Sequence, residues 1–157
     1  MPLFDLRTVV LMSSVMPGLM AIALFSLARS FPVNIRGIRQ WASGSLLVSA
    51  SAVLLALRGE VPDWLSILVA NAGIMSGTSL GLIGSQLFFG RPVTWRSVAL
   101  VLLFGTAGTA LYWLMEDCVA ARAACVTGVL ALLYGAHGWV MLRYGRNIDC
   151  RCVFNKT

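Results

Sequence analysis

Acidic side chains are scarce in this sequence. Six of its 157 residues are Asp or Glu, and none lies within its long uncharged segments. These segments therefore contain neither the buried acidic pair of many hydrolases nor the membrane-embedded carboxylate that proton-coupled carriers use as a relay. Neither a glycine-rich phosphate loop nor a His-Glu-x-x-His helix occurs. These absences predict a protein that is not an enzyme and has no cofactor.

Histidine and cysteine, which bind many protein metals, are also few. Cys150 and Cys152 are separated by one residue, which is not the spacing of a zinc-binding pair. Cys118 and Cys125 are seven residues apart, too far along one helix for a direct disulfide. We therefore expect free thiols and no metal site.

Apolar residues dominate the rest: 59% of residues are hydrophobic, 11% are charged, and the mean hydropathy is +0.85. This composition predicts an integral membrane protein, because an ordinary soluble domain is far more polar. Five segments are suited to helices that cross the roughly 30 Å of bilayer hydrocarbon. They cover residues 8–28, 40–57, 64–89, 97–115 and 120–142. The predicted fold is an all-α, polytopic transmembrane helical bundle over residues 1–146 with a short cytoplasmic tail at 147–157.

The first segment has one alternative interpretation. Ala21-Ile22-Ala23 resembles the cleavage site of a signal peptide. Its apolar run is longer than a usual signal core, however, and three arginines follow it. Pro17 within this run predicts a kink rather than a break, because neighbouring helices can satisfy the backbone groups that proline frees.

The third segment is expected to organise the bundle. It contains no charged residue between Asp63 and Arg91, and Gly73, Gly77 and Gly81 recur every four residues. Small residues at this spacing allow another helix to approach closely, which is a main source of helix association in lipid. We expect these glycines to face the segment at 40–57 or at 120–142, or a second copy of the chain.

Basic residues alternate between the two ends of the predicted spans. Three of the twelve, Arg7, Arg58 and Arg122, lie near most of the acidic residues. The other nine lie at the opposite ends: Arg29, Arg36, Arg39, Arg91, Arg96, Arg143, Arg146, Arg151 and Lys156. Because basic loops remain in the cytoplasm, the N-terminus is predicted outside and the C-terminus inside. The five tryptophans lie near predicted span ends, as expected for interfacial rings.

Three polar residues in the predicted spans are candidates for sensing a signal. His137 is the only histidine, and an imidazole can titrate near neutral pH. Its position near a span end also fits contact with water or headgroups. Asn71 and Gln86 are weaker candidates, because amides in membrane helices commonly form interhelical hydrogen bonds.

Short motifs at the predicted helix ends resemble a known family. The matching stretches are Phe4-Asp5-Leu6-Arg7-Thr8, Gly37-Ile38-Arg39-Gln40-Trp41-Ala42, Leu55-Ala56-Leu57-Arg58-Gly59, Val61-Pro62-Asp63-Trp64-Leu65-Ser66 and Phe88-Phe89-Gly90-Arg91-Pro92. Together they resemble the N-terminal membrane region of bacterial GGDEF-class diguanylate cyclases over roughly residues 3 to 142. In that family this region is a sensory or anchoring input, and a cytoplasmic domain makes cyclic di-GMP. No Gly-Gly-Asp/Glu-Glu-Phe signature occurs here, so no catalytic residue is transferred.

The expected function is therefore a membrane-embedded sensory or anchoring module in the bacterial inner membrane, resembling the input region of a diguanylate cyclase. A small oligomeric transporter is the alternative, because five spans resemble half of a repeat-built carrier. A structural partner subunit is a third possibility. The expected partners are the lipid bilayer and a second copy or a membrane signalling protein. No nucleic-acid partner is expected despite the net charge of +6, because the basic residues follow the pattern of membrane topology.

Overall fold

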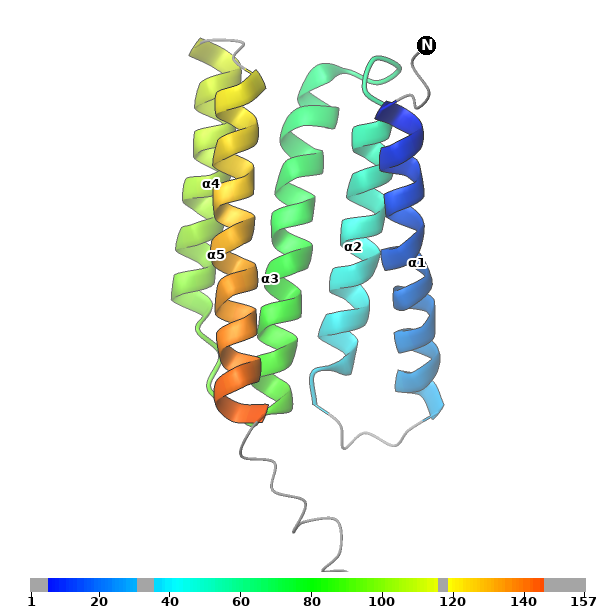
Figure 1. The fold of residues 1–157 in the computed structure, drawn as a ribbon, viewed down its shortest axis with the longest axis vertical. Coiled ribbons are helices and arrows are strands. Elements are labelled where there is room, and N and C mark those ends of the chain that lie inside the picture. Colours follow the sequence, from blue (N-terminus) through cyan, green and yellow to red (C-terminus); the bar gives the residue numbers. More distant parts are fainter. Residues whose placement is uncertain (1–5, 31–35, 116–118, 146–157) are drawn as a thin grey trace, which may run out of the picture.

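The computed structural model describes residues 6–30, 36–115 and 119–145, all as helices and short connections. Five α-helices form the described bundle: α1 (Leu6–Ser30), α2 (Ile38–Ala56), α3 (Ala70–Phe88), α4 (Trp95–Met115) and α5 (Val119–Gly145). A π-helical turn, η1 (Leu65–Val69), leads directly into α3. Figure 1 shows the helices running up and down, with α3 between the α1–α2 pair and the α4–α5 pair. The prediction of an all-α bundle is confirmed, with helix ends within a few residues of the predicted ones.

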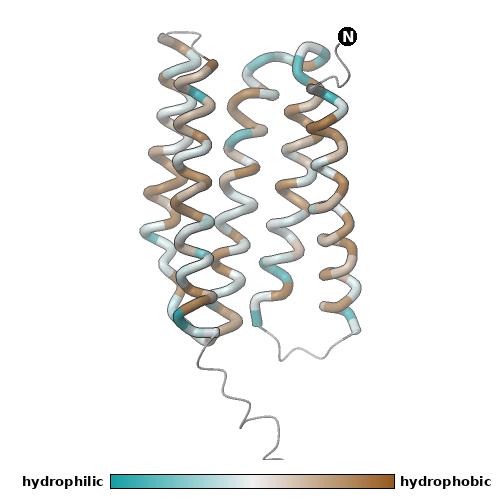
Figure 2. Tube along the Cα trace, in the orientation of Figure 1, coloured by the Kyte–Doolittle hydropathy of each residue, from teal (hydrophilic) through white to brown (hydrophobic). Residues whose placement is uncertain are grey.

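Four of these helices are long and apolar enough to cross a membrane. They cover Arg7–Ser30, Leu65–Phe88, Trp95–Met115 and Val119–Gly145. Figure 2 shows hydrophobic residues along their lengths and hydrophilic ones mainly toward the ends of the bundle. By this criterion the chain is a multi-pass membrane protein. The predicted fifth span, α2, falls outside the criterion, because Arg39, Gln40 and four serines lower the hydropathy of its 19 residues.

Small residues bring α2 and α3 together. A Cβ atom added to Gly77 would lie 2.6 Å from the Gly44 carbonyl oxygen, and one added to Gly44 would lie 2.6 Å from the Gly77 oxygen. Real Cβ contacts are not this short, so only glycine fits at either position. The two backbones therefore touch at this crossing, as small residues allow in membrane bundles.

Larger apolar side chains fill the other half of the bundle. Leu82 and Ile83 of α3, Val98 of α4 and Leu133 of α5 form a buried cluster between 2% and 5% exposed. Partly buried residues pack around it: Leu87, Val93, Val101, Leu102, Val129 and Val140. The α3–α4–α5 side is thus held by interlocking side chains, whereas backbone proximity holds α2 to α3.

The connection between α2 and α3 is a tight turn. Gly59 adopts a φ of 94°, in the left-handed region that glycine tolerates best. Asp63 does not cap the following helix. The Pro62 carbonyl accepts hydrogen bonds from the amides of Leu65 and Ser66, so Asp63 lies inside the first turn rather than at the capping position.

Helix α1 continues without a break through Pro17. Proline lacks an amide hydrogen, and its ring crowds the carbonyl groups of the preceding turn. Ser49 of α2 donates a hydrogen bond of 2.9 Å to the Ser14 carbonyl in that turn. The neighbouring helix therefore supplies a polar contact where the proline disturbs the backbone ladder, as expected from the sequence.

Candidate functional site

A hydrogen-bonded cluster joins α2, α3 and α5, three helices that run side by side in Figure 1. Its centre is Ser85 of α3, whose side chain is fully buried. The Ser85 hydroxyl lies 2.9 Å from Nε2 of His137 on α5 and 3.3 Å from Nε1 of Trp41 on α2. The Trp41 indole also donates to the Gly81 carbonyl at 2.9 Å. We call Trp41, Ser85 and His137 the polar cluster.

A stack of aromatic rings leads from the polar cluster to the end of α5. Trp41 packs on Phe88 with ring centroids 5.6 Å apart, and Phe88 meets Phe89 edge-on at 5.3 Å. Phe89 lies 6.2 Å from the Tyr144 ring, and the Arg91 guanidinium sits 4.0 Å above that ring. Such contacts are favourable beyond the area they bury. They fasten the last turn of α5 to the end of α3.

The polar cluster borders a cleft of about 850 Å³ between α1 and α5. One rim is formed by α1, with Met16, Pro17, Leu19, Met20 and Ala23, and the other by α5, with Tyr134, His137 and Met141. The floor is formed by α2 and α3, with Trp41, Gly44, Ser45, Val48, Gly77, Thr78 and Gly81. Among the described helices, α1 packs only on α2 and does not reach α5. The cleft therefore opens sideways, between its two rims.

The three glycines singled out from the sequence do not share one neighbour. Gly73 faces Ser51 of α2 and Gly77 faces Gly44 and Val48 of the same helix. At Gly81, an added Cβ would have only the His137 ring of α5 nearby, at 3.9 Å, which is ordinary van der Waals contact. Gly73 and Gly77 thus permit the α2–α3 crossing, whereas Gly81 leaves space in front of His137.

The two amides among the candidates lie apart from the cleft. Asn71 donates to the Ile67 carbonyl at 2.6 Å, one turn back within its own helix and inside the π-helical segment. Gln86 bonds twice to Thr94, accepting from its amide at 3.1 Å and donating to its hydroxyl at 3.0 Å. Gln86 therefore ties the end of α3 to the residue before α4. Of the three sensing candidates, only His137 borders the cleft.

Residues 77–81 have the Gly-x-Ser-x-Gly pattern of a serine hydrolase. In those enzymes the serine sits exposed on a sharp turn between a strand and a helix. Here Ser79 is in the middle of α3, is 2% exposed, and donates to the Met75 carbonyl at 2.8 Å. The pattern does not form a nucleophile elbow.

Three residues of interest were not identified from the sequence. The position of Trp41 near a span end predicts an interfacial ring, and nothing in the sequence distinguishes Ser85 from the other serines of the spans. Arg122 lies in the first turns of α5, inside the span predicted at 120–142, and is 4% exposed. Ionisable residues in membrane helices usually face the bundle interior. The position of this arginine within the first turn of the predicted span is the sequence feature that could have identified it.

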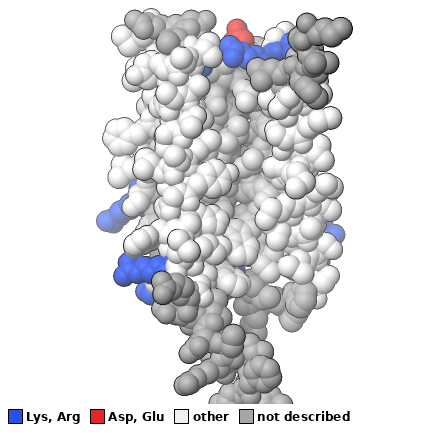
Figure 3. All heavy atoms as spheres, in the orientation of Figure 1, with Lys and Arg blue, Asp and Glu red and all other residues white. Residues whose placement is uncertain are grey.

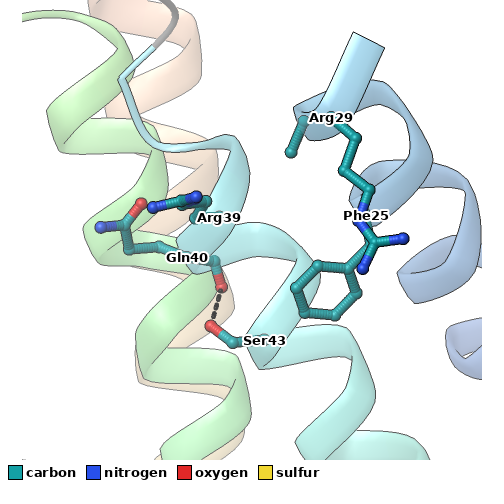
Figure 4. Close-up of a pocket in the computed structure, with 6 residues that line it drawn as sticks. Phe25, Arg29, Arg39, Gln40 and Ser43 are labelled. Atoms are coloured by element: carbon teal, nitrogen blue, oxygen red, sulfur yellow. Dashed lines mark hydrogen bonds between the residues drawn. The ribbon is translucent and has the colours of Figure 1, made fainter. Parts of the chain in front are cut away.

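A second cavity of about 460 Å³ lies at the basic end of α1 and α2 (Figure 4). Phe25 and Arg29 project from α1, and α2 contributes Arg39, Gln40 and Ser43. The Ser43 hydroxyl donates to the Gln40 carbonyl at 3.1 Å. Two arginines without an acidic neighbour in this lining give the cavity a positive charge.

No group of three or more potential metal ligands occurs within residues 6–30, 36–115 and 119–145. Cys125 is a free, half-buried thiol. Cys118, Cys150, Cys152 and the tail at 147–157 lie outside the described residues. Comparisons with protein-family models, with characterised proteins and with solved structures gave no match.

Proposed function

We propose that this chain is a membrane-embedded sensory module without catalysis of its own. The observation that carries the proposal is the polar cluster on the wall of the 850 Å³ cleft. Binding sites in proteins are commonly apolar concavities of this size with a few placed polar groups. The resemblance of the helix-end motifs to the input region of GGDEF-class diguanylate cyclases supports the same function.

Helix α5 is proposed to carry a change in the cleft to the C-terminal end of the bundle. It carries His137 on the cleft and Tyr144 two turns further toward its C-terminal end. Because a helix is stiff over this length, a change in the position of His137 moves the following turns with it. The stack of Phe89, Arg91 and Tyr144 would then respond to the state of the cleft.

The proposed topology has five crossings in the bacterial inner membrane, with the N-terminus outside. Figure 3 shows basic side chains near both ends of this face but acidic ones at only one end, with a broad uncharged band between the two ends. The end without acidic side chains is the one proposed to face the cytoplasm. Helix α2 runs beside α1 and α3 over most of their length (Figure 1), so it is proposed as the fifth span. Its polar side chains have partners: Trp41 and Ser49 both bond to neighbouring helices.

The test is to join the soluble catalytic domain of a diguanylate cyclase after Thr157 and to measure cyclic di-GMP in cells. A sensory module predicts that Ser85→Ala or His137→Leu changes the output at equal membrane abundance. The matched control is Ser97→Ala, on an exposed site of α4, which should leave the output unchanged.

Two outcomes would favour other functions. An output that no cluster substitution alters would indicate an anchor or a structural subunit rather than a sensor. Uptake of a solute by vesicles that contain only this chain would indicate the carrier function. The sensory proposal fails in either case.

A further inference from the structure

The protons of the polar cluster can be assigned from its hydrogen bonds. Ser85 has one hydroxyl proton and two acceptors within reach, the Gly81 carbonyl at 3.0 Å and Nε2 of His137 at 2.9 Å. The Gly81 carbonyl already accepts the Trp41 indole N–H, and the helical ladder of α3 gives it the Ser85 amide as well. Both of its lone pairs are therefore used. The Ser85 hydroxyl lies within donating distance of both acceptors, and because Gly81 already accepts two N–H groups we assign its proton to the shorter contact, with Nε2 of His137.

A neutral imidazole that accepts at Nε2 must carry its own proton on Nδ1. Among the described residues, Nδ1 of His137 has no hydrogen-bond partner. The nitrogen lies 3.9 Å from where a Cβ of Gly81 would be, and both residues line the cleft. The absence of a side chain at Gly81 thus leaves an N–H donor facing open space.

The lining of the cleft restricts what the donor can meet. None of its fifteen residues is Asp, Glu, Lys or Arg. A charged group placed there would lose its hydration without gaining a counter-ion, which is strongly unfavourable. Three of the lining residues, Met16, Met20 and Met141, are flexible thioethers that adapt to irregular apolar shapes.

We propose that the cleft binds an uncharged amphiphile of the membrane, whose carbonyl oxygen accepts a hydrogen bond from Nδ1 of His137 and whose hydrocarbon part lies along the methionines of α1. This proposal names the ligand class of the sensory site proposed above and rests on that function. Two kinds of lipid have this chemistry, the prenylated quinones and the neutral acylglycerols.

The test measures the thermal unfolding midpoint of the full chain in a carbonyl-free alkyl glycoside detergent. A ligand that binds the folded state raises the midpoint as its concentration increases. A short-chain prenylated benzoquinone and a diacylglycerol are titrated separately. The compound that raises the midpoint shows which of the two lipid classes the cleft binds. The isoprenoid hydrocarbon without the quinone ring, and phosphatidylglycerol as an anionic lipid, should bind more weakly.

Two substitutions of His137 distinguish the roles of its two ring nitrogens in ligand binding. Asparagine places an amide N–H about where Nδ1 lies, whereas glutamine reaches the position of Nε2 and keeps a partner for Ser85. His137→Gln should weaken binding about tenfold, and His137→Asn should retain most of it. Equal affinity of His137→Gln and the unmodified chain, or no binding in either lipid arm, overturns the proposal.

A steric pair provides an independent check. Gly81→Leu would fill the space in front of His137 and should abolish the ligand-induced shift. Gly135→Leu adds the same side chain to an exposed position of α5 with nothing within 4 Å, and should bind normally. If Gly81→Leu does not fold, the His137 pair still decides the question. If cluster substitutions change the cyclic di-GMP level of the fusion protein but neither lipid binds, only the ligand class is contradicted. If a lipid binds but the cyclic di-GMP level stays constant, the sensory function is contradicted.

Discussion

Ser85 connects three helices through a single hydroxyl group. It contacts the Trp41 indole of α2, the imidazole of His137 on α5 and the carbonyl of Gly81 on its own helix. Inside a bilayer, water is not available to replace such partners, so each polar group depends on the others. Small changes at this residue are therefore expected to affect the whole polar cluster.

Replacing Ser85 with alanine tests this dependence. The substitution removes the partner of Nε2 of His137 but leaves the 2.9 Å bond from Trp41 to Gly81 in place. We expect a loss of about 1 to 3 kcal/mol in the free energy of unfolding, because a half-buried nitrogen is left unsatisfied. Denaturant titration in detergent measures this loss. Ser97→Ala is the reference, and equal stability of the two variants would contradict the prediction.

Trp41→Phe separates packing from hydrogen bonding. The smaller ring can still stack on Phe88, which lies 5.6 Å away, but no longer donates to Gly81 and Ser85. We expect a stability loss of about 1 kcal/mol for the missing donor. Trp139→Phe is the control, since that ring is 63% exposed. A larger loss for Trp139→Phe would be inconsistent with the described contacts.

At the scale of elements, helix geometry explains why the glycine row has two neighbours. An α-helix advances about 100° per residue, so positions four apart rotate by about 40° at each step. Over the two steps from Gly73 to Gly81 the direction turns by about 80°, away from α2 and toward α5. The row therefore begins against a helix backbone and ends on the cleft.

Gly77→Ala and Gly128→Ala form a matched pair on two helices. The new methyl at position 77 would meet Gly44 and Val48 at 2.6 Å, whereas position 128 has nothing within 4 Å. We expect Gly77→Ala to cost about 1 to 3 kcal/mol of unfolding free energy. Gly128→Ala should be neutral or slightly stabilising, because alanine restricts the unfolded chain. Unfolding titrations of both variants check this.

The oligomeric state is measured in the same samples. Because Gly77 faces α2 of its own chain, Gly77→Ala should lower stability without a specific loss of crosslinked dimer. Loss of dimer at unchanged stability would place the glycine contact between chains, as the sequence also allowed.

The elements could be predicted more readily than their contacts. Long apolar runs give α1, α3, α4 and α5 directly, and Gly59 and Pro62 mark the turn before α3. No sequence pattern predicts the π-helical turn at Leu65–Val69, because its wider hydrogen bonding depends on how this turn packs against neighbouring helices. His137 was a candidate from its chemistry alone. Its contact with Ser85 spans 52 residues of sequence, and no local pattern encodes which faces meet at that separation.

For the whole molecule, the distribution of charge and the position of α3 matter most. Helix α3 packs on α2 on one side and on α4 and α5 on the other, so it joins the two halves of the bundle. Arg7 of α1 donates to the Arg58 carbonyl at 2.9 Å and lies 3.6 Å from Glu60. Both side chains of this ion pair are at least half exposed, so it contributes little to stability.

Reporter fusions test the proposed five crossings. Alkaline phosphatase is active only outside the inner membrane, so a fusion after Glu60 should be active and one after Arg36 inactive. If α2 does not cross the membrane, the two fusions will give the same activity. The reverse pattern would place the N-terminus in the cytoplasm and overturn the proposed orientation.

The sideways opening of the cleft determines which concentration controls its occupancy by a ligand. Its rims on α1 and α5 share no packing contact, so within a bilayer the mouth faces the acyl chains rather than the aqueous phase. A molecule would then arrive by diffusion in two dimensions and would displace lipid instead of water. Occupancy would follow its mole fraction in the membrane, and an abundant lipid with weak affinity would fill the cleft as fully as a rare one that binds tightly.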